Sequence, residues 1–463
     1  MKRNYMKKFS TELTIAYFLI PIFSFAQTSA CGGYHSLSIC NDHTVQTWGD
    51  DLSGQLGDGE PRISSATPVH VIGLTGITAV SGGLSHSLAL KNDSTVWAWG
   101  SNYSGELGSG SNTVDTALPG MVTGLSGIIA IVAGREHSLA LKNDGTVWAW
   151  GNNNKGQLGN GTNTISRIPI QVTGLTGIIA IRGGLYFSLA LKNDGSVWAW
   201  GDNFFGQLGN GTNVDSNIPI QVSLLSGITA IATEGNHCLA LKNDSTISAW
   251  GCNNNGQLGD ATNSNSNIPL QLGLTGIIEI GAGGYHSLAV QNDGSVWTWG
   301  MNTWGQIGNG TSTGSPVPIH IAGLSGIISV SGGIYFSLAK KNDGTIWTWG
   351  EGGHGQLGDG TGVDRNIPTQ TVSLCQNTTT VNEITDENTF SIYPNPSNET
   401  LVITLTVDTF NQNQFQIFNS IGELIKEVSL SQTLQININD LPNGLYFIHQ
   451  KKYPQKTLKF IKK

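Results

Sequence analysis

The chain has 463 residues, with 23 Lys and Arg against 31 Asp and Glu, and its formal net charge is −8. This excess of acidic residues gives no basic surface that could bind a phosphate backbone, so the composition argues against nucleic-acid binding. Only 12% of the residues are charged while 62 are glycine, which favours a rigid β scaffold built on turns.

Residues 1–26 have the pattern of a secretory signal peptide. Four basic residues between positions 2 and 8 precede an apolar stretch from Leu13 to Phe23, and Ser24-Phe25-Ala26 forms a cleavage site. The apolar stretch is too short, and too interrupted by Thr14 and Pro21, for a membrane span. We therefore expect a secreted protein without a transmembrane segment, whose mature form begins near Gln27.

A Trp-Gly pair recurs seven times at intervals of 49 to 51 residues. The tryptophans are Trp48, Trp99, Trp150, Trp200, Trp250, Trp299 and Trp349. A period of this length marks a repeat architecture. In the fullest copies, Ser-Leu-Ala-Leu and Val-Trp-Ala-Trp alternate as half-buried strands do, and the Asn-Asp-Gly between them is a hairpin turn.

Each copy offers four short strands, which in the fourth copy lie at 169–172, 178–181, 188–191 and 197–200. Four antiparallel strands with Gly-rich turns describe a propeller blade. The sequence therefore predicts an all-β fold with a seven-bladed β-propeller over residues 27–376. The first copy starts at its second strand near Ser29, and the last runs on into Pro368 to Val372, so we expect both ends to share the closing blade.

The order of motifs within each repeat resembles that of a known family. Gly-Gly, His-Ser-Leu-Ala-Leu, Lys-Asn-Asp-Gly, Val-Trp-Ala-Trp-Gly and Gly-Gln-Leu-Gly follow one another, and this order resembles the regulator of chromosome condensation family over about residues 27–376. Kelch repeats lack the Gly-Gln-Leu-Gly turn. The resemblance implies a seven-bladed propeller. Its precedents are a guanine nucleotide exchange factor and a secreted bacterial relative that inhibits β-lactamases through one propeller face.

The five cysteines divide into two groups. Cys31 and Cys375 lie at the two ends that must meet when the ring closes, which favours a disulfide between them across a very long loop. Cys40, Cys238 and Cys252 occupy ordinary repeat positions, where we expect small buried side chains.

After Cys375 the composition changes, and residues 377–389 form a polar linker. Alternating runs in residues 390–463 predict a small β-sandwich of Ig-like type. Its sequence resembles the type A C-terminal sorting domain of the bacterial type IX secretion system, through Pro394, Asn395, Gly444, Tyr446 and Lys462. The resemblance implies export by the type IX machinery of a Bacteroidetes-type bacterium, usually with cleavage, to the outer-membrane surface or the medium.

No motif in the chain indicates catalysis, a metal or a cofactor. Histidines recur at one repeat position, but Phe187 and Phe336 fill the same position in two copies. A position that accepts phenylalanine is a packing position. The Asp of the Lys-Asn-Asp turn is likewise a turn former. The candidates for a surface hydrolase or lyase are the carboxylates Asp50, Asp51, Glu136 and Glu351.

Two sets of loops vary strongly between copies, one after Gly-Gly and one after Trp-Gly, and both belong on the same face of a four-stranded meander. They are rich in the aromatic residues that dominate interface hot spots. The predicted binding residues are Tyr34, Tyr103, Arg135, Tyr186, Phe204, Phe205, Tyr285, Trp304, Tyr335 and His354. We expect a monomeric secreted scaffold that binds a protein or glycan. The alternatives are an exchange-factor-type regulator, a surface hydrolase or lyase, and a purely structural surface-layer component.

Overall fold

The computed structural model describes residues 27–60, 63–112, 115–372, 374–375, 390–393, 400–405, 413–419, 423–430, 435–450 and 453–462. The predicted signal peptide, the polar linker, Pro394 and Asn395 lie outside the described residues. The chain divides into two compact units, 1–376 and 377–463. Every regular element within the described residues is a β-strand.

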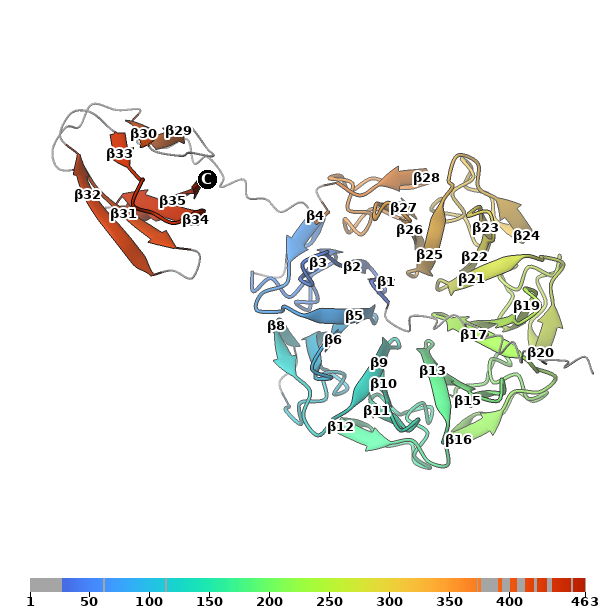
Figure 1. Ribbon diagram of the computed structural model, residues 1–463. Coiled ribbons are helices and arrows are strands. Elements are labelled where there is room, and N and C mark those ends of the chain that lie inside the picture. The colour runs from blue at the N-terminus through green and yellow to red at the C-terminus, as the bar shows by residue number, and fades with distance from the viewer. Residues whose placement is uncertain are drawn as a thin grey trace, which may run out of the picture. The chain divides into compact units, whose positions relative to one another are not determined.

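Seven four-stranded antiparallel sheets surround a common centre in the first unit (Figure 1). Blade 1 holds β1 (Ser29–Cys31), β2 (His35–Ile39), β3 (Val45–Gly49) and β4 (Ser65–His70). Blade 2 holds β5 (Ile77–Gly82), β6 (His86–Lys91), β7 (Val96–Ser101) and β8 (Asp115–Met121). Blade 3 holds β9 (Ile128–Ala133), β10 (His137–Lys142), β11 (Val147–Gly151) and β12 (Ser166–Gln171). Blade 4 holds β13 (Ile178–Gly183), β14 (Phe187–Lys192), β15 (Val197–Gly201) and β16 (Ser216–Gln221).

The remaining three blades repeat the same pattern. Blade 5 holds β17 (Ile228–Thr233), β18 (His237–Lys242), β19 (Ile247–Gly251) and β20 (Ser266–Gln271). Blade 6 holds β21 (Ile277–Ala282), β22 (His286–Gln291), β23 (Val296–Gly300) and β24 (Ser315–His320). Blade 7 holds β25 (Ile327–Gly332), β26 (Phe336–Lys341), β27 (Ile346–Gly350) and β28 (Arg365–Gln370). The seven-bladed propeller is thus confirmed, with the first strand of each blade innermost (Figure 1).

The expectation of a shared closing blade is wrong. Each blade consists of four strands that are consecutive in the chain, from β1–β4 at one end to β25–β28 at the other. The Pro-x-x-Val strand pairs with the Trp-Gly strand before it, so β28 completes blade 7 without help from the N-terminus. The ring closes through ordinary blade-to-blade contacts, in which β1 meets β25 and β26.

The predicted pairing of Cys31 with Cys375 is also wrong, because Cys375 bonds to Cys40. Cys31 lies in the innermost strand, where it is buried and packs beside Trp48 and Phe336. Cys31 pairs with Ser36 near the start of β2, whereas Cys375 lies beside Cys40 and Gln46 at the other end of that strand, so most of the length of β2 separates the two thiols. Cys40 opens the β2–β3 turn and lies within reach, with a Cα–Cα distance of 5.2 Å.

The second strand of each blade is buried on both faces, although its alternating pattern predicts a half-buried strand. His86–Lys91, for example, exposes only its last residue in part. Neighbouring sheets stack face to face, so both sides of the strand meet another blade. The seven Trp-Gly tryptophans are among the largest fully buried side chains.

One hydrogen-bond arrangement joins all seven blades. The indole Nε1 of each Trp-Gly tryptophan donates to the backbone carbonyl of the Gln or Glu in the Gly-Gln-Leu-Gly turn of the preceding blade, at 2.6 to 2.9 Å. In six boundaries the serine of the second strand donates to the same carbonyl at 2.8 to 3.0 Å. Each boundary is therefore fixed at a backbone atom, whatever the loop side chains are.

The repeat histidines extend this arrangement to the next blade. The Nε2 atoms of His35, His86, His137, His237 and His286 lie 2.8 to 3.1 Å from the serine Oγ of the following blade. Because that serine donates its own proton to the carbonyl, the histidine must donate from Nε2. Burial lowers the pKa of His137 to about 3. The packing role predicted for this position agrees with these contacts.

We expect acid to unfold the propeller through these histidines. Their pKa values are lower in the folded chain than the ordinary 6.5, so stability is lost as the pH falls from about 6.5 towards 3. The double variant His137→Phe with Ser188→Cys recreates the natural pair Phe187 and Cys238, which pack together in one core. It should move the acid-unfolding midpoint, followed by tryptophan fluorescence, to lower pH.

The control for this experiment is Ser188→Cys alone, which keeps the titrating histidine. An unchanged acid midpoint in the double variant would show that protonation of His137 does not drive unfolding.

The second unit is a sandwich of two sheets. One sheet has the order β29 (Phe390–Tyr393), β30 (Thr400–Leu405), β33 (Gln435–Asn437). The other has the order β32 (Leu424–Leu430), β31 (Asn413–Asn419), β34 (Gly444–Gln450), β35 (Tyr453–Lys462). Both contribute to one core, for example through Leu401 from the first sheet and Phe415 from the second.

Three of the predicted sorting-signal residues lie together on β34 and β35. Gly444 pairs with Lys462 across the two strands. Tyr446 is buried, stacks on Phe460 with a ring distance of 5.5 Å, and donates from its hydroxyl to the Pro442 carbonyl at 2.9 Å. These contacts show how the motif residues stabilise the sandwich.

Breaking the Cys40–Cys375 bond should destabilise the closed ring. The bond spans 335 residues, and a loop of that length gives a chain-entropy stabilisation of about 6 kcal/mol at most. Cys375→Ser should lower the melting temperature under oxidising conditions, and a reductant should remove the difference from the unmodified chain. Cys31→Ala is the control, because its melting curve should keep the full response to the reductant.

Candidate binding face

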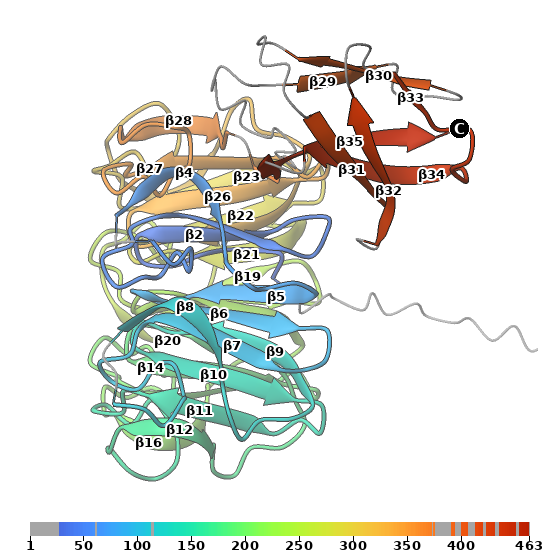
Figure 2. The same ribbon diagram turned by 90° about the vertical axis from the view of Figure 1, so that its left-hand side faces the viewer.

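The two variable loops of each blade are joined by one backbone hydrogen bond. The N–H of the residue after Trp-Gly donates to the carbonyl of the residue before the second strand, as Asp50 does to Tyr34 at 2.9 Å and Asp202 does to Tyr186 at 2.9 Å. Both loops therefore emerge on one face of the propeller, called the loop face here. Figure 2 shows the propeller from the side.

The opposite face carries the Asn-Asp-Gly turns. There the Asp144 carboxylate accepts the amide of Thr146 at 3.0 Å and its hydroxyl at 2.6 Å. These hydrogen bonds lower the pKa of Asp144, with the hydroxyl as the largest cause. The turn-forming role predicted for this aspartate is confirmed.

Five of the ten predicted binding residues form one cluster, called the aromatic patch: Tyr34, Tyr285, Trp304, Tyr335 and His354. Tyr335 lies at its centre, stacked on Tyr285 with a ring distance of 5.5 Å and an interplanar angle of 12°. Tyr34 and Trp304 each lie 6.4 Å from Tyr335. His354 lies 4.9 Å from Tyr34. The patch thus bridges blades 6, 7 and 1.

The patch is partly shielded from water. Burial, followed by the neighbouring phenols of Tyr285 and Tyr34, raises the pKa of Tyr335 to about 12. Trp304 remains 38% exposed. His354 Nδ1 lies 3.6 Å from Asp50 Oδ1, which gives the patch a polar edge. Rings that are packed together in this way present a preformed apolar surface to a partner.

The other five predicted residues do not join the patch. The Arg135 guanidinium lies over the Tyr186 ring at 5.7 Å. Phe204 and Phe205 meet edge to face at 4.9 Å. Tyr103 is 79% exposed and lines a cavity together with Arg135. The predicted aromatic face is therefore divided into one large patch and smaller groups outside it.

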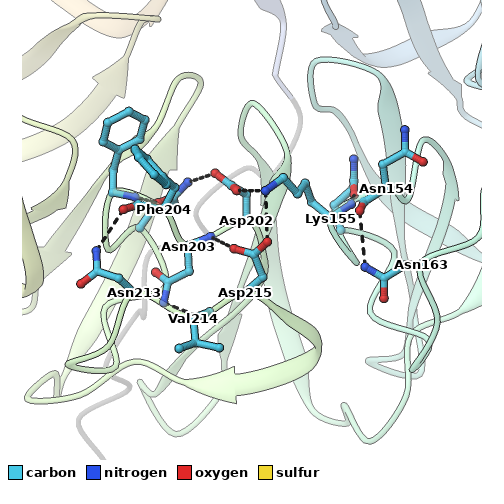
Figure 3. Close-up of polar contacts among 12 residues, drawn as sticks. Asn154, Lys155, Asn163, Asp202, Asn203, Phe204, Asn213, Val214 and Asp215 are labelled. Atoms are coloured by element: carbon cyan, nitrogen blue, oxygen red, sulfur yellow. Dashed lines mark hydrogen bonds and ion pairs between the residues drawn. The ribbon is translucent and has the colours of Figure 1, made fainter.

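Lys155 joins two blades beside the phenylalanine pair (Figure 3). Its Nζ lies 2.9 Å from Asp202 Oδ1 and 3.1 Å from Asp215 Oδ2. Asp215 also accepts the amide of Asn203 at 2.8 Å. An ion pair therefore links the loops of blades 3 and 4 on the loop face.

The four carboxylates considered for catalysis are engaged in loop structure. Asp50 Oδ2 accepts from Gln55 at 2.7 Å, and Asp51 Oδ1 accepts the Leu56 amide at 2.8 Å. Glu136 accepts from Asn152 at 2.9 Å, and Glu351 accepts from Gln356 at 3.3 Å. Their contacts are those of loop-forming residues.

Glu106 is a candidate site residue that the sequence prediction missed. Six copies of the repeat read Gly-Gln-Leu-Gly or Gly-Gln-Ile-Gly, whereas residues 105–108 read Gly-Glu-Leu-Gly. Comparison of the seven copies at this position could have found it. Glu106 is 2% exposed and lines a cavity of about 300 Å³ together with Tyr103, Arg135 and Glu136. Burial, with a smaller contribution from the Glu136 carboxylate, raises the pKa of Glu106 to about 7.

Glu106→Gln, which restores the residue found in the other six copies, should change the pH dependence of stability. The pKa of Glu106 is higher in the folded chain than its ordinary 4.5, so the contribution of Glu106 to wild-type stability should fall as the pH rises from about 4.5 to 7, against the opposite trend from the histidines. The variant should match the wild type near pH 4 and be more stable by up to about 3 kcal/mol near pH 8. Urea unfolding across this range tests it, and parallel curves would contradict it.

Within the part of the chain that the structure describes, no group of three or more His, Cys, Asp or Glu side chains could hold a metal ion. The same residues include no helix long and apolar enough to cross a membrane.

The fold and the repeat define a seven-bladed propeller of the regulator of chromosome condensation type, followed by a sorting domain. Residues 115–400 match the family model of the RCC1-like domain, and residues 42–90 and 77–106 match the RCC1 repeat. The chain belongs to the RCC1-like domain family. Residues 391–463 match the secretion system C-terminal sorting domain. This domain indicates type IX export to the cell surface or beyond in a Bacteroidetes-type bacterium.

Similar proteins cover a wide range of organisms. The probable E3 ubiquitin-protein ligase HERC6 of Homo sapiens is 44% identical over 133 residues, 28% of this chain and 13% of that protein. Protein pim1 of Schizosaccharomyces pombe is 32% identical over 151 residues, 28% of each chain. The matched segment is therefore a minor part of each relative.

Solved structures resemble the propeller over most of its length. Prp20p from Saccharomyces cerevisiae has a TM-score of 0.65 at 26% identity, covering 71% of this chain and 86% of that chain. Human WBSCR16 has a TM-score of 0.65 at 26% identity, covering 71% of this chain and 94% of that chain.

Proposed function

We propose that this protein is a secreted or cell-surface binding scaffold whose aromatic patch contacts a protein or glycan. The observation that carries the proposal is the clustering of Tyr34, Tyr285, Trp304, Tyr335 and His354. The seven copies of the repeat do not share aromatic side chains at these positions. Clustered, partly desolvated aromatics are the side chains that contribute most to binding energy at interfaces.

The sorting domain supports this proposal, because it directs the propeller to a place where a partner outside the cell can reach the loop face. The Prp20p structure was described together with the binding properties of that protein towards Gsp1p and histones. A propeller of this family can therefore act by binding. Export speaks against an exchange-factor role on a nuclear GTPase, and the loop contacts of the four carboxylates give little support to a hydrolase or lyase.

Replacing the centre of the patch should weaken binding while the fold is kept. Tyr285→Ala with Tyr335→Ala should weaken binding of the secreted protein by about 2 kcal/mol or more, roughly 30-fold, because stacked rings near the centre of an interface act as hot spots. Binding would be measured on an array of bacterial and host glycans and on purified surface proteins, and circular dichroism would verify the fold.

Phe204→Ala is the matched control, because it removes an exposed aromatic side chain from the same face outside the patch. Equal binding by the double variant and the wild type, or an equal loss in Phe204→Ala, would contradict the assignment of the patch.

A further inference from the structure

The boundary between blades 3 and 4 shows how this fold holds an ammonium group. Lys155 Nζ lies between the carboxylates of Asp202 and Asp215, at 2.9 and 3.1 Å (Figure 3). Gln207, from the Gly-Gln-Leu-Gly turn of blade 4, donates to the second oxygen of Asp202 at 2.6 Å. The Lys155 ammonium group therefore lies close to Gln207. In this boundary the cation is a side chain of the propeller itself.

The boundary between blades 1 and 2 lacks the lysine and carries an acid at the Gln position of the turn. Alignment of the repeats places Ser53, Ser101, Glu106 and Asp115 where the other boundary has Lys155, Asp202, Gln207 and Asp215. Two serines replace a lysine and an aspartate, so the space that Lys155 fills elsewhere is open here. The cavity of about 300 Å³ lies at this position, with Ser53, Ser101 and Glu106 in its lining.

The Glu106 carboxylate has few partners for a buried group. It is 2% exposed, and its Oε2 accepts the Ser104 amide at 2.8 Å. Among the described residues, no side chain donates a hydrogen bond to it. Burial of a carboxylate with so few donors is unfavourable, and the charge of Arg167 offsets it only in part. The Glu136 carboxylate, which also lines the cavity, adds like charge.

Two arginines lie near the Glu106 carboxylate, and Arg135 itself lines the cavity. Arg135 Nε lies 3.7 Å from Glu136 Oε1, and its guanidinium lies over the Tyr186 ring. Arg167 donates to the backbone carbonyls of Asn102 and Tyr103 at 3.3 and 3.4 Å. Among the described residues, neither arginine forms an ion pair with Glu106.

We propose that this cavity binds a primary ammonium group, as at the end of a lysine side chain, with Glu106 as its main anion. The serine hydroxyls of Ser53 and Ser101 supply further acceptors for the three N–H donors. The exposed ring of Tyr103 lines the same cavity and can cover an aliphatic stem. The site is independent of the aromatic patch, so each can fail without the other.

Titration of the full chain with butylammonium and with N-acetyl-lysine methylamide, observed by NMR, tests the site directly. Both should bind near pH 8 and more weakly near pH 6, where Glu106 takes up its proton, and butanol of similar size should not bind. Glu106→Gln should weaken binding at least tenfold. Binding of the lysine derivative alone would indicate a protein partner, and binding of both amines a site for alkylamines in general. Equal binding of butylammonium to wild type and Glu106→Gln, or none to wild type, would overturn the proposal.

An internal lysine provides a second test that needs no ligand. Ser53→Lys should place an ammonium group in the cavity as Lys155 does in blade 3, raise the melting temperature near pH 8 by about 2 °C, and block butylammonium. The gain should shrink in the Ser53→Lys, Glu106→Gln double variant. Leu52→Lys, at a neighbouring position that is 66% exposed, is the control for added charge. A gain no larger than that of Leu52→Lys, or unaffected by Glu106→Gln, would count against the site.

Discussion

The propeller depends on a hydrogen-bond acceptor that belongs to the backbone. In every blade the carbonyl of one turn residue receives the indole N–H of the next blade, and in six boundaries also a serine hydroxyl. Because the acceptor is a main-chain atom, the side chain at that residue is free to change. Glu106 uses this freedom, since its carbonyl binds Trp150 as the other copies do while its carboxylate faces a cavity. The backbone contact between blades and the side chain that faces the cavity thus belong to different atoms of the same turn.

The aromatic patch lies across the seam where the first and last blades meet. Tyr34 belongs to blade 1 and His354 to blade 7, and their rings lie 4.9 Å apart. The Cys40–Cys375 bond joins the same two blades. The arrangement of the patch therefore requires a closed ring, so the disulfide bears on the geometry of the patch as well as on stability.

Repetition explains which features could be predicted from the sequence. The strand pattern and the position of the variable loops recur in seven copies. Each copy therefore supports the prediction made from the others, and the number of copies gives the number of blades. The Cys40–Cys375 pairing could not be predicted in this way, because it occurs once and depends on which end of β2 the chain reaches after blade 7. Cys31 lies near one end of that strand and Cys40 just beyond the other. Glu106 was missed because it replaces Gln in a turn that recurs in every copy, and the whole turn was interpreted as structural. The aromatic residues were found, but only three-dimensional contacts separate the patch from Phe204 and Tyr103.

The bond between residues 40 and 375 makes most of the propeller a covalent circle. A protease that cuts an exposed loop within it, for instance near Ile63 or Val214, would open the chain without releasing a fragment. The two new ends would stay tethered through the ring, and each sheet would keep its neighbours on both sides. Cleavage in the polar linker would remove the sorting domain and leave this circle whole, because Cys375 precedes the linker. Towards extracellular proteases the propeller would behave as a cyclic polypeptide, which tolerates a first nick.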